Sequence, residues 1–354
     1  MELIQMSYAQ LANKFQRVLD KTVDNKSVFG VSVCIENGER SLAFSGAAGN
    51  LTPESQYFIA STTKLYTSAI IFKLASQNKL QLDQPVANYL DKAIMDGLLV
   101  IKGVDYSPQI TIRQLLAHTS GLPDYFQQKK ANGKSFLAEL TAGIDQGWSF
   151  EQVISESKKM PPAFRPGEKG KALYSDTNYQ ILGRLIETVS AKSIHTALEE
   201  FIFAPLGLQK TYLYADSQDT RPAPLYYKKN RLHVPLAMTS FGTDGGIVST
   251  SAELMVFLKA FFGGKLFPGE NFAWMKQWNR IFFPLEAGIG LTRFKLPRLF
   301  SPFQAIPEFI GHSGLSGTVA FFAPEKDFYL TGTVNQVDNP GRSFRLMIEL
   351  LNCL

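Results

Sequence analysis

Cysteine, histidine and metal-binding motifs are scarce in this chain of 354 residues. It has two cysteines, Cys34 in an apolar stretch and Cys353 beside the last residue, and four histidines. The cysteines have neither the spacing of a metal site nor the pattern of a disulfide framework. No His-Glu-x-x-His or Cys-x-x-Cys motif occurs. We therefore expect no bound metal and no cofactor.

Long apolar runs are absent as well. Charged residues such as Lys73, Asp96 and Lys259 interrupt the most apolar stretches, so no run of about 18 residues predicts a membrane span. The N-terminus lacks the basic and apolar segments of a secretion signal. We expect no signal peptide in the chain as given. The compartment stays open: cytoplasmic as the chain stands, or exported if a signal has been removed.

Positive charge is in slight excess, with 36 Lys and Arg against 31 Asp and Glu, for a formal net charge of +5. The basic residues are scattered rather than gathered in a run or an Arg-rich helix, so we expect no nucleic-acid partner. The length corresponds to roughly two structural units with a large core. Nothing in the sequence indicates an oligomeric state.

Strand patterns lie near both ends of the chain. Residues 28–49 contain two β-branched and aromatic runs around an Asn-Gly pair, which is a typical hairpin signal. A second pair of runs flanks the turn residues 324–327. Amphipathic helices are predicted at the two ends, over Leu3–Leu19 and from about Arg342.

The segment between these strand patterns is mostly helical, from Ser61 to about Gly264. We predict an α+β fold in which one antiparallel sheet is built from both termini, is flanked by helices and receives a large, mostly helical insertion. The predicted domains are residues 1–80 together with 210–354, and residues 81–209. The active site is expected in the crevice between them.

Ser61-x-x-Lys64 is one of three Ser-x-x-Lys segments, and the others begin at Ser76 and Ser155 in polar surroundings. Ser61 follows a short apolar run and opens a strongly apolar helical segment. A helix start favours a developing negative charge, and a lysine three residues later shares the helix face. Burial is expected to lower the pKa of Lys64 so that it accepts the serine proton. By itself the motif more often marks a serine N-cap with a solvated lysine.

Two later segments supply partners for Ser61. Tyr174-x-Asp176 precedes a predicted helix and follows a turn-rich stretch, although a tyrosine at such a position is by itself more often a core residue than a catalytic one. His312 has glycines on both sides, which let a strand pass close to a neighbouring segment.

In this order, Ser61-x-x-Lys64, Tyr174-Ser175-Asp176 and His312-Ser313-Gly314 resemble the three motifs of class C β-lactamases and low-molecular-weight penicillin-binding proteins. That superfamily includes esterases and D-aminopeptidases. The segments HTSGLPDY, NYQILGRLIE, APLGL and GTDGGIVSTSAEL resemble those that accompany the motifs, so the similarity covers most of the chain from about residue 28. The resemblance implies a serine hydrolase with the β-lactamase/transpeptidase-like form of the α+β fold.

The resemblance also implies roles for single residues. Ser61 is the implied nucleophile, with Lys64 and Tyr174 sharing the proton transfers, and Lys64 is expected to lower the pKa of Tyr174. The backbone N–H groups of Ser61 and Leu315 are the implied oxyanion-hole donors, each worth about 3 kcal/mol in the transition state. The residues implied to bind the substrate are Asp176, His312, Ser313, Gly314 and Leu315.

Two residues depart from the family pattern. Asp176 stands at the usual Asn, and an ionised carboxylate cannot donate a hydrogen bond to the acyl-amide carbonyl of a penicillin-type substrate. We expect Asp176 to receive a substrate amino group, or to pair with Lys64 or His312. His312 stands at the usual Lys and is mostly neutral at pH 7 unless a carboxylate raises its pKa, so it holds a substrate carboxylate less well.

Other candidates carry less weight. His118 and Asp124 invite a Ser-His-Asp interpretation, but no Gly-x-Ser-x-Gly elbow is present, so we predict that His118 is a buried structural residue at a helix end. Residues 125–150, with Trp148 predicted to be exposed, and residues 221–236 are irregular and rich in aromatic side chains. We expect both segments to overhang the crevice and select the substrate.

The sequence thus predicts a serine hydrolase that cleaves an ester or amide of a small-molecule or peptide-like acyl substrate through an acyl-enzyme on Ser61. Two alternatives stay open: a true class C-type β-lactamase or D-Ala-D-Ala carboxypeptidase, and a catalytically silent penicillin-binding or scaffold protein. The presence of Ser61, Lys64 and Tyr174 argues against the silent protein, because binding alone has no chemical need of all three.

Overall fold

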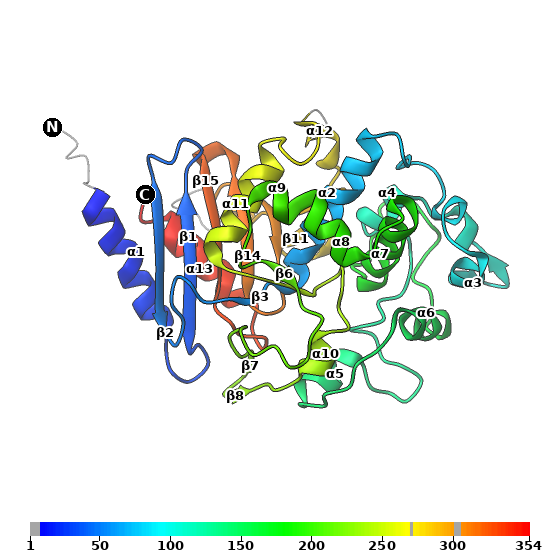
Figure 1. Ribbon diagram of the computed structural model, residues 1–354, viewed down its shortest axis with the longest axis horizontal. Coiled ribbons are helices and arrows are strands. Elements are labelled where there is room, and N and C mark those ends of the chain that lie inside the picture. The colour runs from blue at the N-terminus through cyan, green and yellow to red at the C-terminus, as the bar shows by residue number, and fades with distance from the viewer. Residues whose placement is uncertain (1–7, 270–271, 301–305) are drawn as a thin grey trace.

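The main antiparallel sheet joins the two ends of the chain. In the computed structural model, which describes residues 8–269, 272–300 and 306–354, its strand order is β10-β11-β12-β13-β14-β15-β1-β2 (Figure 1). The predicted hairpins are confirmed as β1–β2 and β14–β15, and β1 pairs with β15. The strands are β1 Gly30–Glu36, β2 Ala43–Gly49, β10 Asn279–Phe282, β11 Leu285–Ala287, β12 Thr292–Phe294, β13 Phe309–Ser313, β14 Thr318–Ala323 and β15 Phe328–Thr333. The predicted α+β fold, with one sheet made from both ends of the chain, is confirmed.

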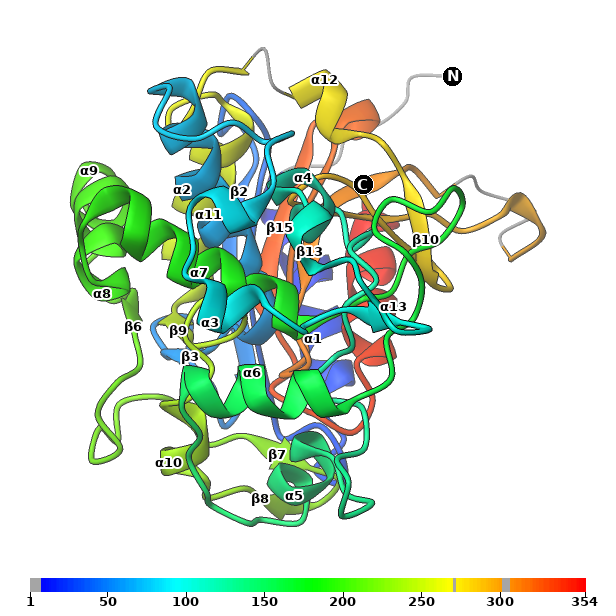
Figure 2. The ribbon, with the colours of Figure 1, turned by 90° about the vertical axis from the view of Figure 1, so that its right-hand side faces the viewer.

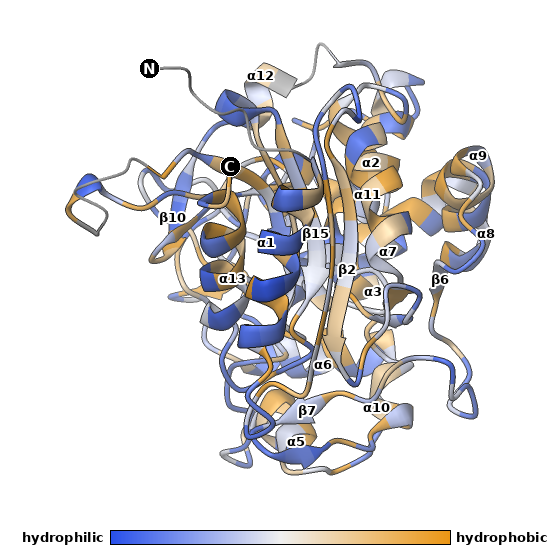
Figure 3. Cartoon of the chain, turned by 90° about the vertical axis from the view of Figure 1, so that its left-hand side faces the viewer, coloured by the Kyte–Doolittle hydropathy of each residue, from blue (hydrophilic) through white to orange (hydrophobic). Residues whose placement is uncertain are grey.

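The helices nearest the two ends of the chain cover one face of this sheet. α1 (Tyr8–Thr22) and α13 (Gly341–Leu351) contact each other, and α1 also contacts β1 and β2. Phe15 of α1 and Val31 of β1 belong to the same core, while the outward side of α1 is hydrophilic (Figure 3). Both predicted terminal helices are confirmed, although residues 3–7 of the first lie outside the described residues.

The opposite face of the sheet packs against α2 (Thr63–Ser76) and α11 (Ser251–Phe262). α2 is apolar on all sides and mostly buried, because it contacts the sheet and α7 (Asp176–Ser190) at the same time. Ser61 lies in the 3₁₀ turn η1 (Ala60–Thr62) that leads into α2. The nucleophile candidate therefore lies at the junction of the sheet and the helical part of the molecule.

The chain between β2 and β10 is mostly helical. Figure 2 shows α6 beside α7, with α5, α10 and the β7–β8 hairpin grouped below them. The helices are α3 Lys92–Met95, α4 Ile112–Leu116, α5 Phe136–Thr141, α6 Phe150–Lys159, α8 Ile194–Leu198, the π-helical η4 Glu199–Phe203, α9 Ala204–Leu206, α10 Pro235–Met238 and α12 Phe272–Met275. Short strands are β3 Tyr57–Phe58, β4 Val100–Ile101, β5 Val104–Asp105, β6 Tyr212–Leu213, β7 Tyr226–Tyr227, β8 Asn230–Arg231 and β9 Ile247–Ser249. Further 3₁₀ turns are η2 Val86–Asn88, η3 Ser107–Gln109, η6 Arg298–Phe300 and η7 Pro324–Lys326.

The proposed division into residues 1–80 with 210–354 and residues 81–209 stays a prediction. Within the described ranges, no helix has both the length and the apolar character needed to cross a membrane.

Candidate active site

Ser61 is presented by a strained turn. The preceding residue, Ala60, has a φ of +46°. This left-handed conformation costs a residue with a Cβ about 1–2 kcal/mol, and such strain is typical of positions where the surrounding structure fixes a functional side chain. Ser76 and Ser155, which begin the other two Ser-x-x-Lys segments, are exposed. Lys64 is fully buried, and the predicted position of Ser61 at the start of a buried helix is confirmed.

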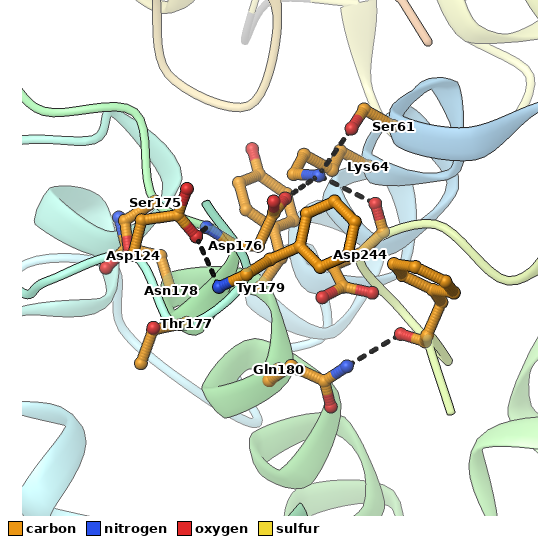
Figure 4. A network of polar contacts seen from close by, with 12 residues as sticks. Ser61, Lys64, Asp124, Ser175, Asp176, Thr177, Asn178, Tyr179, Gln180 and Asp244 are labelled. Atoms are coloured by element: carbon orange, nitrogen blue, oxygen red, sulfur yellow. Dashed lines mark hydrogen bonds and ion pairs between the residues drawn. The ribbon is translucent and has the colours of Figure 1, made fainter. Parts of the chain in front are cut away.

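The ammonium group of Lys64 makes three polar contacts (Figure 4). Nζ lies 2.5 Å from Oδ1 of Asp176, 3.0 Å from Oγ of Ser61 and 2.6 Å from the backbone oxygen of Asp244. Burial disfavours the charged ammonium, but the neighbouring anionic groups, Asp176 first among them, outweigh burial and raise the pKa of Lys64. The predicted lowering of this pKa is wrong, because Lys64 is the cation of a buried ion pair.

Asp176 is fixed at the first residue of α7. Its backbone N–H donates to Oδ1 of Asp124 at 3.2 Å, and the same oxygen accepts the N–H of Phe126 at 3.1 Å. The start of a helix favours a negative charge, which suits an ionised Asp176. Of the partners expected for Asp176, Lys64 is the one that the structure provides.

Tyr174 lies beside the same ammonium group. Nζ of Lys64 is 5.2 Å from the centre of the tyrosine ring, and Tyr174 and Ser61 line the same cavity. Burial raises the pKa of Tyr174, and the charge of Lys64 offsets only part of that effect. The expected net lowering is therefore wrong. Tyr174 is a neutral phenol that can give a proton to a group bound beside Ser61.

The third motif, His312-Ser313-Gly314, passes directly beside the turn η1, which holds Ser61. A Cβ on Gly314 would lie 2.3 Å from the backbone oxygen of Ile59, so only glycine fits without displacing one of the two segments. The predicted close approach of this strand to another segment is confirmed. Leu315 and Ser61 line the same cavities, and the oxyanion-hole role of their N–H groups stays a prediction.

His312 is buried and electrically neutral. Its Nδ1 lies 2.8 Å from the backbone oxygen of Ser313. Burial first, and the charge of Lys64 second, lower the pKa of His312 to about 3. At pH 7 this imidazole therefore supplies no positive charge for a substrate carboxylate.

Sequence reasoning missed Asp244 and Tyr125, which are both buried next to the ion pair. The hydroxyl of Tyr125 donates to Oδ2 of Asp244 at 2.8 Å. Burial, with the charge of Asp176 added to it, raises the pKa of Asp244 well above its ordinary value. Of these two carboxyl groups, Asp176 is the one whose oxygen lies in contact with the ammonium group of Lys64. Asp244 could have been suspected from the sequence, because it is an acidic residue directly before two glycines in the segment GTDGGIVSTSAEL.

His118 and Asp124 do not form a catalytic pair with each other. Nδ1 of His118 accepts the backbone N–H of Ser175 at 3.1 Å, whereas Asp124 accepts the N–H groups of Asp176 and Phe126. His118 is 2% exposed and lies just after α4, so the predicted structural role at a helix end is confirmed.

The buried Asp124 carboxyl predicts an unusual dependence of stability on pH. Burial first, and the charge of Asp176 second, raise the pKa of Asp124 to about 8. Between its unfolded value near 4 and this folded value, the folded protein keeps a proton that the unfolded chain has released. We therefore expect the free energy of unfolding, measured with urea, to fall as pH rises through this interval. Asp124→Asn keeps the acceptor oxygen and should flatten the decline; equal slopes in the two proteins would contradict the assignment.

Two cavities open on Ser61. The residues that line pocket A alone include Phe58, Leu140, Leu225, Met238, Phe241, Asp244 and Val337. The residues that line pocket B alone include Tyr174, Ile281, Phe282, Leu285, His312, Ser313, Gly314 and Phe344. Ser61, Phe126, Asp176 and Leu315 line both. The reacting bond of a substrate can thus lie at Ser61 with one part of the molecule in each pocket.

Trp148 packs against two residues that line pocket A, Phe126 and Phe241. Trp148 was predicted to be exposed, but it is 8% exposed and packs against Phe126, Phe136 and Phe241. The segments 125–150 and 221–236 do supply lining residues of the pocket, and their role in substrate selection stays a prediction. In the described ranges, no group of three or more His, Cys, Asp and Glu side chains could hold a metal ion.

Comparisons with known proteins identify the family and the fold of the chain. The profile of the family described as Beta-lactamase matches residues 15–351. A putative D-alanyl-D-alanine carboxypeptidase of Escherichia coli (strain K12) is 26% identical over 325 residues, which are 82% of this chain and 71% of the relative. The crystal structure of a D-stereospecific amidohydrolase from Streptomyces sp. aligns with a TM-score of 0.76 at 26% identity, over 94% of this chain and 97% of that one. The structure of EstCE1, a hydrolase with promiscuous acyltransferase activity, aligns with a TM-score of 0.80 at 19% identity over 98% of both chains.

Proposed function

This chain belongs to the Beta-lactamase family of serine hydrolases, and we propose that it cleaves an ester or amide bond through an acyl-enzyme on Ser61. The observation that carries the proposal is the position of Ser61. Its Oγ accepts a hydrogen bond from buried Lys64 and lies where pockets A and B meet. A nucleophile in contact with proton-transfer groups and with space on both sides is what acyl transfer requires.

The ion pair determines how Ser61 loses its proton. Lys64 is already protonated, so it can accept the proton of Ser61 only if it passes one of its own to Asp176 across the 2.5 Å contact. The serine oxygen then forms a bond to the substrate carbonyl carbon, and the carbonyl π electrons move onto its oxygen. The proton lost by Ser61 is thereby stored on Asp176, through Lys64.

Collapse of this tetrahedral intermediate breaks the bond to the leaving group, which departs with the bonding electron pair. Tyr174 is the proton donor for that atom, because its hydroxyl is neutral and the residue lies beside the Lys64 ammonium group in the cavity that Ser61 also lines. Asp176 then restores the tyrosine proton through Lys64. A water molecule then attacks the acyl carbon and gives a proton to Lys64, which passes one of its own to Asp176. The bond from the acyl carbon to Oγ of Ser61 breaks with its electron pair moving onto Oγ, and Oγ takes the proton back from Lys64 as Asp176 returns its own.

This assignment gives the two pockets different roles. The leaving group lies in pocket B, where Tyr174 lies, and the acyl group lies in pocket A. The wall of pocket A is mostly apolar and aromatic, which supports an apolar acyl group. The name of one similar structure, a D-stereospecific amidohydrolase, supports an amide as the substrate class.

Active-site labelling tests the proposed function. A fluorophosphonate should add to Ser61 in one-to-one ratio, as detected by intact mass and peptide mapping, and p-nitrophenyl esters should be hydrolysed. A fluorescent penicillin separates the alternatives: a stable adduct favours a penicillin-binding protein, and a transient adduct favours a β-lactamase. Absence of reaction with either probe would rule out catalysis by Ser61.

A further inference from the structure

The side chains that line pocket B indicate which leaving group it binds. Building on the function proposed above, we propose that pocket B binds a neutral leaving group with an aromatic ring, and that Phe282 is the residue that selects it. The other groups that line this pocket, and their charges, support the same conclusion.

Phe282 is an aromatic side chain placed in the path of the leaving group. It ends strand β10, is 52% exposed, and its ring centre lies 6.0 Å from that of Tyr174 with the planes at 75°. Tyr174 in turn stacks on His118 at 4.5 Å. Because Tyr174 protonates the departing atom, a ring attached to that atom lies within contact distance of Phe282, and edge-to-face or offset contacts between such rings are favourable.

The neighbouring lining of pocket B is apolar as well. Ile281 and Leu285 come from the same β10–β11 hairpin, and Phe344 comes from α13. A large apolar side chain exposed in a cavity next to a nucleophile gains free energy when a ligand removes it from water. Pocket B therefore favours a ring over a small polar leaving group.

Charge in the same pocket disfavours an acidic leaving group. Among the described residues that line pocket B there is no Lys or Arg, and His312 is neutral at pH 7. The charge of Asp176 on this lining is already paired with Lys64, so the lining residues leave no cation for a carboxylate. Arg280 also lies on β10 but lines a separate depression on the hairpin. A peptide whose leaving amino acid carries a free carboxylate is thus a poor fit.

Three esters of one apolar acyl group test the proposal: the phenyl ester, the 3-carboxyphenyl ester and the methyl ester. We expect kcat/KM to be highest for the phenyl ester and at least about tenfold lower for its carboxylated analogue, although the two phenols are similar leaving groups. Phe282→Ala should lower kcat/KM for the phenyl ester about 5- to 10-fold and leave the methyl ester within about twofold. The matched control is Phe283→Ala, since Phe283 is more exposed and is not part of the lining of pocket B.

The possible outcomes separate the leaving-group proposal from the proposed function. Three outcomes would each overturn the leaving-group proposal. In the first, Phe282→Ala loses equal activity toward the phenyl and methyl esters; in the second, Phe282→Ala and Phe283→Ala have equal effects. In the third, the carboxyphenyl ester is cleaved as fast as the phenyl ester. Fluorophosphonate labelling of each variant reports separately on Ser61. If Ser61 is not labelled, the proposed function fails; an NMR titration with phenol and benzoate then still tests pocket B, and equal binding of the two would overturn the proposal.

Discussion

Ser61→Ala is expected to abolish covalent labelling by a fluorophosphonate and to lower ester hydrolysis on the order of 10⁵-fold or more, because no acyl-enzyme can form without the oxygen nucleophile. The change removes a single atom from η1, so the fold should survive. The measurements are intact mass after labelling and kcat/KM for a p-nitrophenyl ester, with circular dichroism to check folding.

The chain offers a matched control for this variant. Ser76 also begins a Ser-x-x-Lys segment, at the exposed end of α2, where its hydroxyl donates to the backbone oxygen of Lys73. Ser76→Ala should keep full labelling and full activity. If Ser61→Ala kept the label, or Ser76→Ala lost it, the assignment of the nucleophile would be wrong.

Asp176→Asn is expected to change the pH dependence of kcat/KM. In the natural protein the carboxylate raises the pKa of Lys64. In the proposed mechanism the pair accepts the serine proton as a unit. Without the anion, burial acts on Lys64 unopposed and lowers its pKa, so the rate should follow deprotonation of Lys64 alone. At the acid end of the profile, where Lys64 is charged and has no carboxylate to receive its proton, we expect a loss of about 10²-fold.

The measurement for Asp176→Asn is kcat/KM of one ester from about pH 5 to about pH 9. A suitable control is Asp219→Asn, which removes a carboxylate whose ion pair is with the exposed Arg221. The control should reproduce the natural profile. A profile for Asp176→Asn that runs parallel to the natural one would show that this carboxylate takes no part in proton transfer.

Local sequence patterns predicted the elements that carry the site. The Asn-Gly hairpin, the apolar helix after Ser61 and the glycines around His312 each have a local physical cause, such as turn geometry or the absence of a Cβ, so the sequence contains the necessary information. The order of the three motifs added the fold and the reaction class. These predictions agree with the structure and with the family match.

The electrostatics of the site were not predictable in the same way. Burial lowers the pKa of Lys64 and a nearby negative charge raises it, so the direction depends on which of the two effects is larger. The 2.5 Å contact with Asp176 makes the charge effect the larger one. The sequence indicated three possible partners for Asp176 without distances to choose among them. Trp148 was misjudged for a related reason, because the aromatic residues that bury it include Phe241, far from it in the chain.

The position of β15 in the sheet bears on when, during synthesis of the chain, the active site is assembled. Because β15 lies between β14 and β1, the sheet is complete only when residues 328–333 have paired with residues 30–36. Ser61 precedes β13 in the chain, so a growing chain carries Ser61 before the strand that brings the third motif to it has been made. We expect hydrolysis to begin only once β13 and β15 have joined the sheet.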